Sequence, residues 1–261
     1  MQRIYNLRAR PHRMLQENGP ELLFMKMDSR FLFNLKLKKG KRSDWELYFI
    51  NAEERFQSGN LIKKGDSLLA KLDPFDNEMI FHVQGDSLAG QVRRQDGKGT
   101  ALKLRAAKGR SNRFAFPVAD YLGDINGTYE VTFFLKSGGS DPSVAIFKQE
   151  GQRLTASFLR ITGDSRFLEG VIINDSFFLS SYIGYSPSFY RGRIEKDGKI
   201  SGETVGARGP GQRFEGVLND EASLPDAFEL TTLREGYSRF DFSFPDMKGK
   251  KSFTLRCTLP K

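Results

Sequence analysis

Short stretches in which apolar and polar residues alternate constrain the fold of this chain more than any other sequence feature. The clearest is Gly127 to Lys136, whose apolar positions include Tyr129, Val131, Phe133 and Leu135. Alternation with a period of two places such side chains on one face of a β-strand. Similar stretches recur from Phe31 to Val217, and we find no convincing amphipathic helix of three turns. The sequence therefore predicts an all-β protein.

The connectors between these stretches have the composition of hairpin turns. Gln84–Ser87, Glu150–Gln152 and Lys196–Lys199 each contain a glycine where a positive φ is expected. The turns recur at the roughly 8–12-residue spacing of antiparallel sandwiches and barrels.

The pattern also occurs twice along the chain. Gly65-Asp66-Ser67 is followed by one strand, a turn at Pro74 and a second strand, and Asn174-Asp175-Ser176 is followed by the same order around Pro187. We therefore predict two similar antiparallel β-meander units, sandwich or barrel-like, and a short irregular tail. The expected boundaries are 1–116 for the first unit with an N-terminal extension, 117–222 for the second unit, and 223–261 for a linker and a final strand.

Charge and rare residues limit the chemistry of the chain. Its net charge of +9 permits an anionic partner, but the densest basic run, Lys36–Arg42, is typical of a solvated hairpin end, and we expect no nucleic-acid partner. One cysteine and two histidines exclude an intramolecular disulfide and the usual zinc sites. We predict no cofactor, no metal site and no catalytic residue, and hence no enzyme in the chain as it stands.

Membrane and targeting signals are also missing from the sequence. No stretch has the apolar length of a membrane span, and the N-terminal residues contain no signal-peptide apolar region. A cytoplasmic location is expected if the start is genuine.

Two groups of residues could form a site. The carboxylates Glu169, Asp175, Glu195 and Glu203 lie on or near adjacent candidate strands, where a barrel could bring two together as a glycosidase pair, although solvated strand positions are the default. Aromatic residues crowd two neighbouring strands: Phe177, Phe178, Tyr182, Tyr185, Phe189 and Tyr190. They could line a groove for a sugar, peptide or lipid, or they could fill the core or a domain interface, which we favour.

Several short motifs resemble one known family. They are Gly127–Val131, Thr162–Gly170, Leu233–Tyr237 and Phe242–Lys250. Together they resemble the N-terminal β-rich region of TlpA-like thiol:disulfide oxidoreductases of the AhpC/TSA, or redoxin, type, which are cell-envelope proteins. The Phe-x-Phe-Pro-Asp stretch at 242–246 resembles the first strand of their thioredoxin-like domain.

The chain departs from this family where its chemistry would lie. A Cys-x-x-Cys should follow the last motif, but only Cys257 does, and it fits neither the spacing nor the pattern. The resemblance therefore implies a truncated, non-catalytic accessory region of a periplasmic protein of cell redox homeostasis. Its partner would be a thioredoxin-like domain or a protein substrate. Phe240, Phe242 and Phe244 would alternate in a strand that has no sheet to join, and this exposed or docking strand would be open to self-association.

Two other hypotheses remain open. One is a stand-alone, lipocalin-like ligand-binding β-barrel or sandwich of the cell envelope, which predicts a deep apolar pocket. The other is an anion-binding surface protein that uses the net positive charge.

Overall fold

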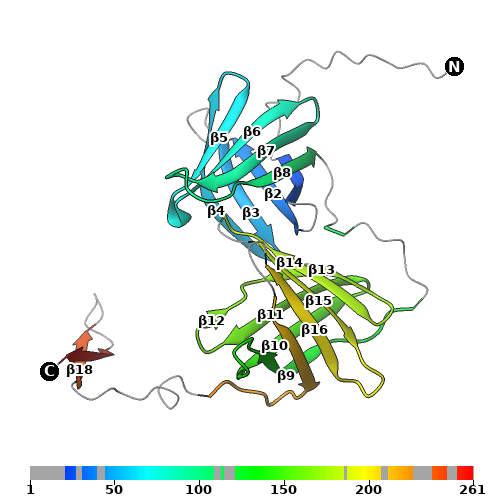
Figure 1. Cartoon of the computed structure of the whole chain (residues 1–261), viewed down its shortest axis with the longest axis vertical. Coiled ribbons are helices and arrows are strands. Elements are labelled where there is room, and N and C mark those ends of the chain that lie inside the picture. The colour runs from blue at the N-terminus through cyan, green and yellow to red at the C-terminus, as the bar shows by residue number, and fades with distance from the viewer. Residues whose placement is uncertain are drawn as a thin grey trace. The chain divides into compact units, whose positions relative to one another are not determined.

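The fold is described from a computed structural model of the chain (Figure 1). The structure describes residues 21–27, 31–39, 45–108, 113–114, 121–184, 187–206, 211–225, 237–245 and 252–260. It divides into two compact units, Met1–Leu224 and Pro225–Lys261, and each is described by itself. Within the described ranges every element is a β-strand except one short 3₁₀ turn, η1 (Asp73–Phe75), which confirms the all-β prediction.

The first eight strands form a closed antiparallel barrel in which each strand pairs with the next. They are β1 (Glu21–Met27), β2 (Phe31–Lys39), β3 (Trp45–Asn51), β4 (Glu54–Lys64), β5 (Ser67–Leu72), β6 (Asn77–Gln84), β7 (Ser87–Arg94) and β8 (Leu102–Lys108). The ring closes because β1 also pairs with β8, for example Leu23 with Lys108. Both strands at the seam thus have a partner on each side.

The second sheet has the same up-and-down order. Its main strands are β9 (Gly127–Phe134), β10 (Ser140–Glu150), β11 (Arg153–Arg160), β13 (Leu168–Ile173), β14 (Ser176–Ser181), β15 (Ser188–Ile194), β16 (Ile200–Gly206) and β17 (Arg213–Leu218). The two-residue β12 (Gly163–Asp164) pairs only with β11. Because β9 pairs with both β10 and β17, and β10 pairs with β11, this sheet also returns on itself.

The two rings match the repeat seen in the sequence. The Gly65-Asp66 turn joins the fourth and fifth strands of the first ring, and the Asn174-Asp175 turn joins the corresponding strands of the second. Gly65 and Asn174 both have positive φ, at 59° and 51°. Glycine and asparagine tolerate this conformation best. The two similar meander units are therefore confirmed, whereas the exact domain boundaries stay a prediction.

The two barrels have cores of different composition. The first is mainly aliphatic and includes Leu35, Leu47 and Leu72, each fully buried. In the second, the ring of Phe158 lies 4.7 to 5.7 Å, centroid to centroid, from Phe133, Phe147, Tyr190 and Phe214. An eight-stranded barrel is just wide enough for side chains to fill it. Aromatic rings thus occupy the part of the second barrel where the lipocalin-like hypothesis expects a ligand.

Two glycines let aromatic rings in the core of the second barrel lie directly against the backbone of its strands. A Cβ on Gly192 would lie 2.4 Å from Cζ of Phe177, and one on Gly202 would lie 2.4 Å from Cζ of Phe214. Real Cβ atoms do not approach this closely, so no other residue fits without displacing the core. Because strand residues alternate, the neighbours of Gly192 point outward.

The C-terminal unit is a hairpin of β18 (Tyr237–Pro245) and β19 (Ser252–Pro260). Phe240, Phe242 and Phe244 fall on β18, as the alternation predicts. The expectation that this strand lacks a partner was wrong, because the residues after Lys251 form a second strand that pairs with it. The side chains of this hairpin lie outside the described part of the structure, so their exposure stays a prediction.

Candidate functional site

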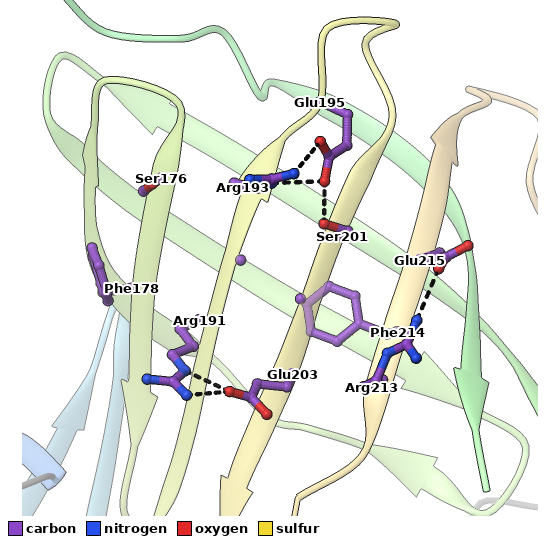
Figure 2. A pocket seen from close by; sticks show the side chains of 12 residues that line it. Ser176, Phe178, Arg191, Arg193, Glu195, Ser201, Glu203, Arg213, Phe214 and Glu215 are labelled. Carbon is purple, nitrogen blue, oxygen red and sulfur yellow. Dashed lines mark hydrogen bonds and ion pairs between the residues drawn. The ribbon is translucent and has the colours of Figure 1, made fainter.

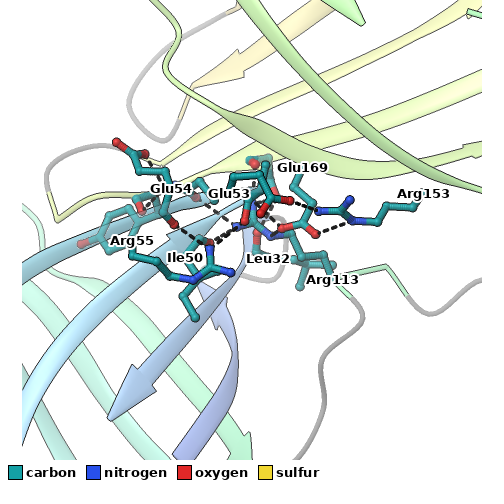
Figure 3. A network of polar contacts seen from close by, with 12 residues as sticks. Leu32, Ile50, Glu53, Glu54, Arg55, Arg113, Arg153 and Glu169 are labelled. Carbon is teal, nitrogen blue, oxygen red and sulfur yellow. Dashed lines mark hydrogen bonds and ion pairs between the residues drawn. The ribbon is translucent and has the colours of Figure 1, made fainter. Parts of the chain in front are cut away.

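One buried arginine joins the ends of the two barrels. Arg113, which is 3% exposed, donates hydrogen bonds to the backbone carbonyls of Ile50 in β3 and Ser180 in β14 (Figure 3). Its Nη2 also lies 3.0 Å from Oδ1 of Asn51, and its Nε lies 3.5 Å from Oε2 of Glu169 in β13. A single guanidinium therefore satisfies acceptors from both barrels.

The electrostatics of this junction depend on Glu169. Burial lowers the pKa of Arg113 to about 10, and the carboxylate of Glu169 acts in the opposite direction. Arg113 thus stays a cation at neutral pH. Glu169 also accepts hydrogen bonds from the backbone N–H of Ala52 at 3.1 Å and from Nε of Arg153 at 3.1 Å. A buried charge is tolerated only when it is paired and hydrogen-bonded in this way.

The second barrel inserts a tyrosine into the first. Tyr182, which follows β14, is fully buried in the core of the first barrel, with its ring centroid 4.4 Å from that of Phe33 and 5.0 Å from that of Phe49. The amide of Asn51 binds both the N–H and the C=O of Tyr182 at 3.1 Å. Asn77 donates to the carbonyl of Gly184 at 2.9 Å. Two buried asparagines therefore hold the inserted segment.

The hydroxyl of Tyr182 has no hydrogen-bond partner among the described residues. Its burial raises the pKa of Tyr182 far above the usual value. Buried polar groups of this kind are uncommon in folded proteins and each needs an explanation.

A depression of about 460 Å³ lies beside this inserted segment. Its lining comes from η1 of the first barrel, from the segment after β14, and from the β11–β13 connection and β15 of the second barrel. The lining residues are Phe75, Arg160, Thr162, Gly163, Asp164, Ser165, Arg166, Ser181, Tyr182, Ile183, Ser188 and Tyr190. We call this depression the junction pocket. Ligand sites concentrate at domain interfaces and in the mouths of β-barrels, and its volume lies in the usual range for such sites.

Two lining residues of the junction pocket are fixed by the second barrel. Arg160 pairs with Asp141, bonds Oε1 of Gln212 at 3.1 Å, and lies 4.5 Å from the ring centroid of Phe133. Burial raises the pKa of Tyr190 to about 12, whereas Arg160 and a hydrogen bond with Ser165 act in the opposite direction. The phenol is therefore neutral near pH 7 and can both donate and accept a hydrogen bond.

Arg166 is the most unusual lining residue. Its φ is 59°, a conformation that costs energy for a residue with a side chain, and its N–H donates to Oδ1 of Asp164 at 2.8 Å. Its guanidinium pairs with Glu54 of the first barrel. Its Nε is buried without a partner among the described residues. Backbone strain and an unsatisfied buried donor therefore occur in the same lining residue.

The aromatic residues singled out in the sequence lie in several places. Phe177 and Tyr190 are in the core of the second barrel, and Tyr182 is in the core of the first. Phe189 packs against the first core, and the rings of Phe178 and Phe189 lie 6.4 and 6.1 Å from that of Phe114. Tyr185 lies outside the described residues. A binding role for this group as one surface stays a prediction.

Two of the four carboxylates considered as a glycosidase pair, Glu195 and Glu203, line one depression on the outer face of the second barrel, where each is paired with an arginine, Arg193 or Arg191. The other two lie elsewhere: Glu169 is at the junction, and Asp175 is in the turn from β13 to β14. In the part of the chain described here, no group of three His, Cys, Asp or Glu side chains has metal-binding geometry. Within the same part, no helix has the length and apolarity needed to cross a membrane.

Comparisons with known proteins give only distant likenesses. No protein-family model and no curated protein sequence matches the chain. One similar solved structure is a candidate outer membrane protein from Bacteroides fragilis, with 10% identity, a TM-score of 0.25, and 76% of this chain and 96% of that chain covered. A protein of unknown function from the DUF3598 family of Nostoc punctiforme has 11% identity and a TM-score of 0.26, with 78% and 96% covered. HpuA from Kingella denitrificans, solved in complex with human haemoglobin, has 12% identity and a TM-score of 0.25, with 82% and 92% covered.

The resemblance to TlpA-like redoxins was wrong. No family model of that type matches the chain. Nothing therefore supports a redox role, a thioredoxin-domain partner or a truncated chain, all of which the resemblance implied. One of its motifs has a local cause, because Thr162–Gly170 covers the connection from β11 to β13 and the first residues of β13. Glycine and aspartate recur in such turns whatever the family.

Proposed function

We propose that this protein is a non-catalytic binding protein whose ligand occupies the junction pocket. The observation that carries the proposal is Arg166, a lining residue of that pocket whose backbone is strained. Strain of this kind persists where the surrounding structure holds it and clusters at ligand sites.

The charges around the junction pocket limit the ligand. Arg160 and Arg166 line it, but each is already paired with a carboxylate, Asp141 or Glu54, and Asp164 adds a negative charge. This balance disfavours a ligand with several negative charges. Hydroxyl groups from Thr162, Ser165, Ser181, Ser188 and Tyr190 complete the lining. We therefore expect a small, neutral or singly charged ligand that carries hydrogen-bond acceptors.

The position of the pocket supports a role for both barrels in binding. Phe75 belongs to the first barrel and Tyr190 to the second, and the network around Arg113 fixes one barrel end against the other. Because this frame is rigid, the site is already ordered before the ligand arrives, so binding loses less conformational entropy. This differs from a lipocalin-like arrangement, in which the ligand lies inside one barrel.

A blocking substitution tests the proposal. Thr162 is exposed and lines the junction pocket, so Thr162→Trp should fill it without disturbing the core. Ser137→Trp, at another exposed turn position of the second barrel, is the matched control. A panel of monosaccharides, nucleosides, amino acids and small carboxylic acids is screened by the shift in Tm. Compounds that stabilise the natural chain should also stabilise the Ser137→Trp variant but not the Thr162→Trp variant.

Two results would contradict the proposal. Ligands that stabilise both variants equally would place the site elsewhere, and the absence of any stabilising compound would leave the pocket without a binding role. The lipocalin-like hypothesis includes a location in the cell envelope, and fractionation of cells that express the full-length gene tests that part separately.

A further inference from the structure

The outer face of the second barrel carries a second depression, distinct from the junction pocket. It has a volume of about 610 Å³ and crosses strands β14 to β17 (Figure 2). We call it the outer groove. Its lining residues are Ser176, Phe178, Arg191, Gly192, Arg193, Glu195, Ser201, Gly202, Glu203, Arg213, Phe214 and Glu215.

Strand register places one row of side chains directly across this groove. Phe178 pairs with Arg191, Arg191 with Glu203, and Glu203 with Arg213. Arg213 in turn pairs with Phe134 of β9, and its guanidinium lies 5.6 Å from the Phe134 ring centroid. The row therefore begins and ends with an aromatic ring and has charged groups between them.

Each arginine of the outer groove is held by a glutamate (Figure 2). Arg193 binds both carboxylate oxygens of Glu195 at 2.8 Å, and Nε of Arg191 lies 2.7 Å from Oε1 of Glu203. The third pair is Arg213 and Glu215, at 3.3 Å. Three cations and three anions line the groove, so their formal charges cancel.

We propose that the outer groove binds a neutral glycan. A guanidinium has five N–H donors and a carboxylate has about four acceptor sites, so a paired arginine and glutamate still offer both to a ligand. Sugar hydroxyls both donate and accept, and therefore match a surface on which the two alternate. Planar pairs such as Arg193–Glu195 hold these groups in place before the ligand arrives. The aromatic rings at the two ends of the row offer apolar surface to the C–H faces of sugar rings.

The same charges argue against an anionic polymer. Binding of a polyanion draws on uncompensated lysines and arginines that displace counterions. Here Glu195, Glu203 and Glu215 neutralise the arginines and would repel phosphate or sulfate groups. The aromatic ends are also accessible, because Phe134 is 39% exposed and Phe178 is half-buried.

A charge-preserving double substitution tests this site in the full chain. Arg191→Gln together with Glu203→Gln removes one pair without changing the net charge. The matched control replaces Arg93 and Glu78, a cross-strand pair on the first barrel with Nε and Oε1 2.6 Å apart, by glutamine. Binding is measured on an array of neutral α- and β-glucans, mannans, xylans and galactans. The groove variant should bind at least about tenfold more weakly, which corresponds to about 1.4 kcal/mol, and the control should bind as the natural chain does.

Further measurements separate a lost site from a lost fold. Exposed ion pairs contribute about 0–1 kcal/mol, so both double variants should keep the Tm of the natural chain within a few degrees. If the groove variant does not fold, Ser176→Trp fills the groove from its edge and should produce the same loss of binding. Thr162→Trp should leave glycan binding unchanged, so failure of the junction pocket and failure of the outer groove are distinguishable.

Binding to dextran sulfate is compared at about 50 mM and about 500 mM salt. Retention on neutral glycans at both salt concentrations supports the proposal. Retention only on dextran sulfate at low salt would overturn it in favour of an anion-binding surface. Binding to no neutral glycan, or equal losses in the groove and control variants, would also overturn it.

Discussion

Replacing Tyr182 by phenylalanine should stabilise this protein, although the side chain is fully buried and a hydroxyl group is lost. The tyrosine ring packs in the core of the first barrel, 4.4 Å from Phe33 and 5.0 Å from Phe49, centroid to centroid. Phenylalanine keeps these ring contacts. It removes a hydroxyl that has no partner among the described residues.

The expected magnitude follows from the cost of that hydroxyl. A buried polar group without a hydrogen bond costs about 1–3 kcal/mol in mutational data. Tyr182→Phe should therefore raise the free energy of unfolding by about that amount. For a chain of this size, the gain corresponds to a rise in Tm of roughly 2–10 °C.

Urea unfolding, followed by fluorescence and circular dichroism, measures the effect. Tyr190→Phe is the control, because Tyr190 lines the junction pocket together with Ser165, which can bind its hydroxyl, and the substitution should lower stability by about 0.5–1.5 kcal/mol. The two variants remove the same atom from two barrel cores, so opposite signs isolate the role of the partner. A midpoint shift at constant slope reports stability alone.

A destabilised Tyr182→Phe variant would refute this reasoning. It would mean that the hydroxyl of Tyr182 is hydrogen-bonded in solution, for example by a buried water inside the first barrel. Equal and negative shifts in both variants would lead to the same conclusion.

Two further predictions concern buried ionisable groups. Arg113→Met should lower the free energy of unfolding by about 3–5 kcal/mol, because it leaves Glu169 without one of its cations and removes three buried hydrogen bonds. A loss below about 1 kcal/mol in urea unfolding would contradict the network. Burial raises the pKa of Tyr190 to about 12. In the folded chain the phenol of Tyr190 therefore stays protonated between pH 10 and 12, whereas in the unfolded chain it loses its proton near pH 10. This contribution to stability is fully present below pH 10 and is lost between pH 10 and 12, with a slope of about 1.4 kcal/mol per pH unit. Tyr190→Phe should therefore flatten the alkaline unfolding curve, and an unchanged curve would show that the phenol titrates normally.

The strands and the repeat could be predicted because their signals are local. Alternation in β9 and the turn at Gly65-Asp66 each depend on a few neighbouring residues, and both are where the sequence predicts them. Closure of each ring and the pairing of β18 with β19 could not be predicted in the same way. Each depends on which distant strand supplies the partner, and alternation alone does not specify that.

The junction was missed for a related reason. Arg113 lies in a stretch of small and polar residues that is typical of a linker, but its acceptors come from residues more than 60 positions away in either direction. Tyr182 lies just beyond the end of β14, where the alternation that assigns a face no longer applies. Phe177 lies on β14, the strand that Tyr182 follows, but it is inside the second barrel whereas Tyr182 is inside the first. No short-range pattern distinguishes these two destinations.

The insertion of Tyr182 also has a consequence for synthesis of the chain on the ribosome. All strands of the first barrel precede residue 109, so this barrel can close while the second is still being made. The residue that later fills its end has not yet been translated at that moment. Asn51 and Asn77 then lack the backbone groups that they bind in the finished protein. The nascent first barrel therefore passes through a stage with an open apolar end, which a chaperone could bind until the second barrel arrives.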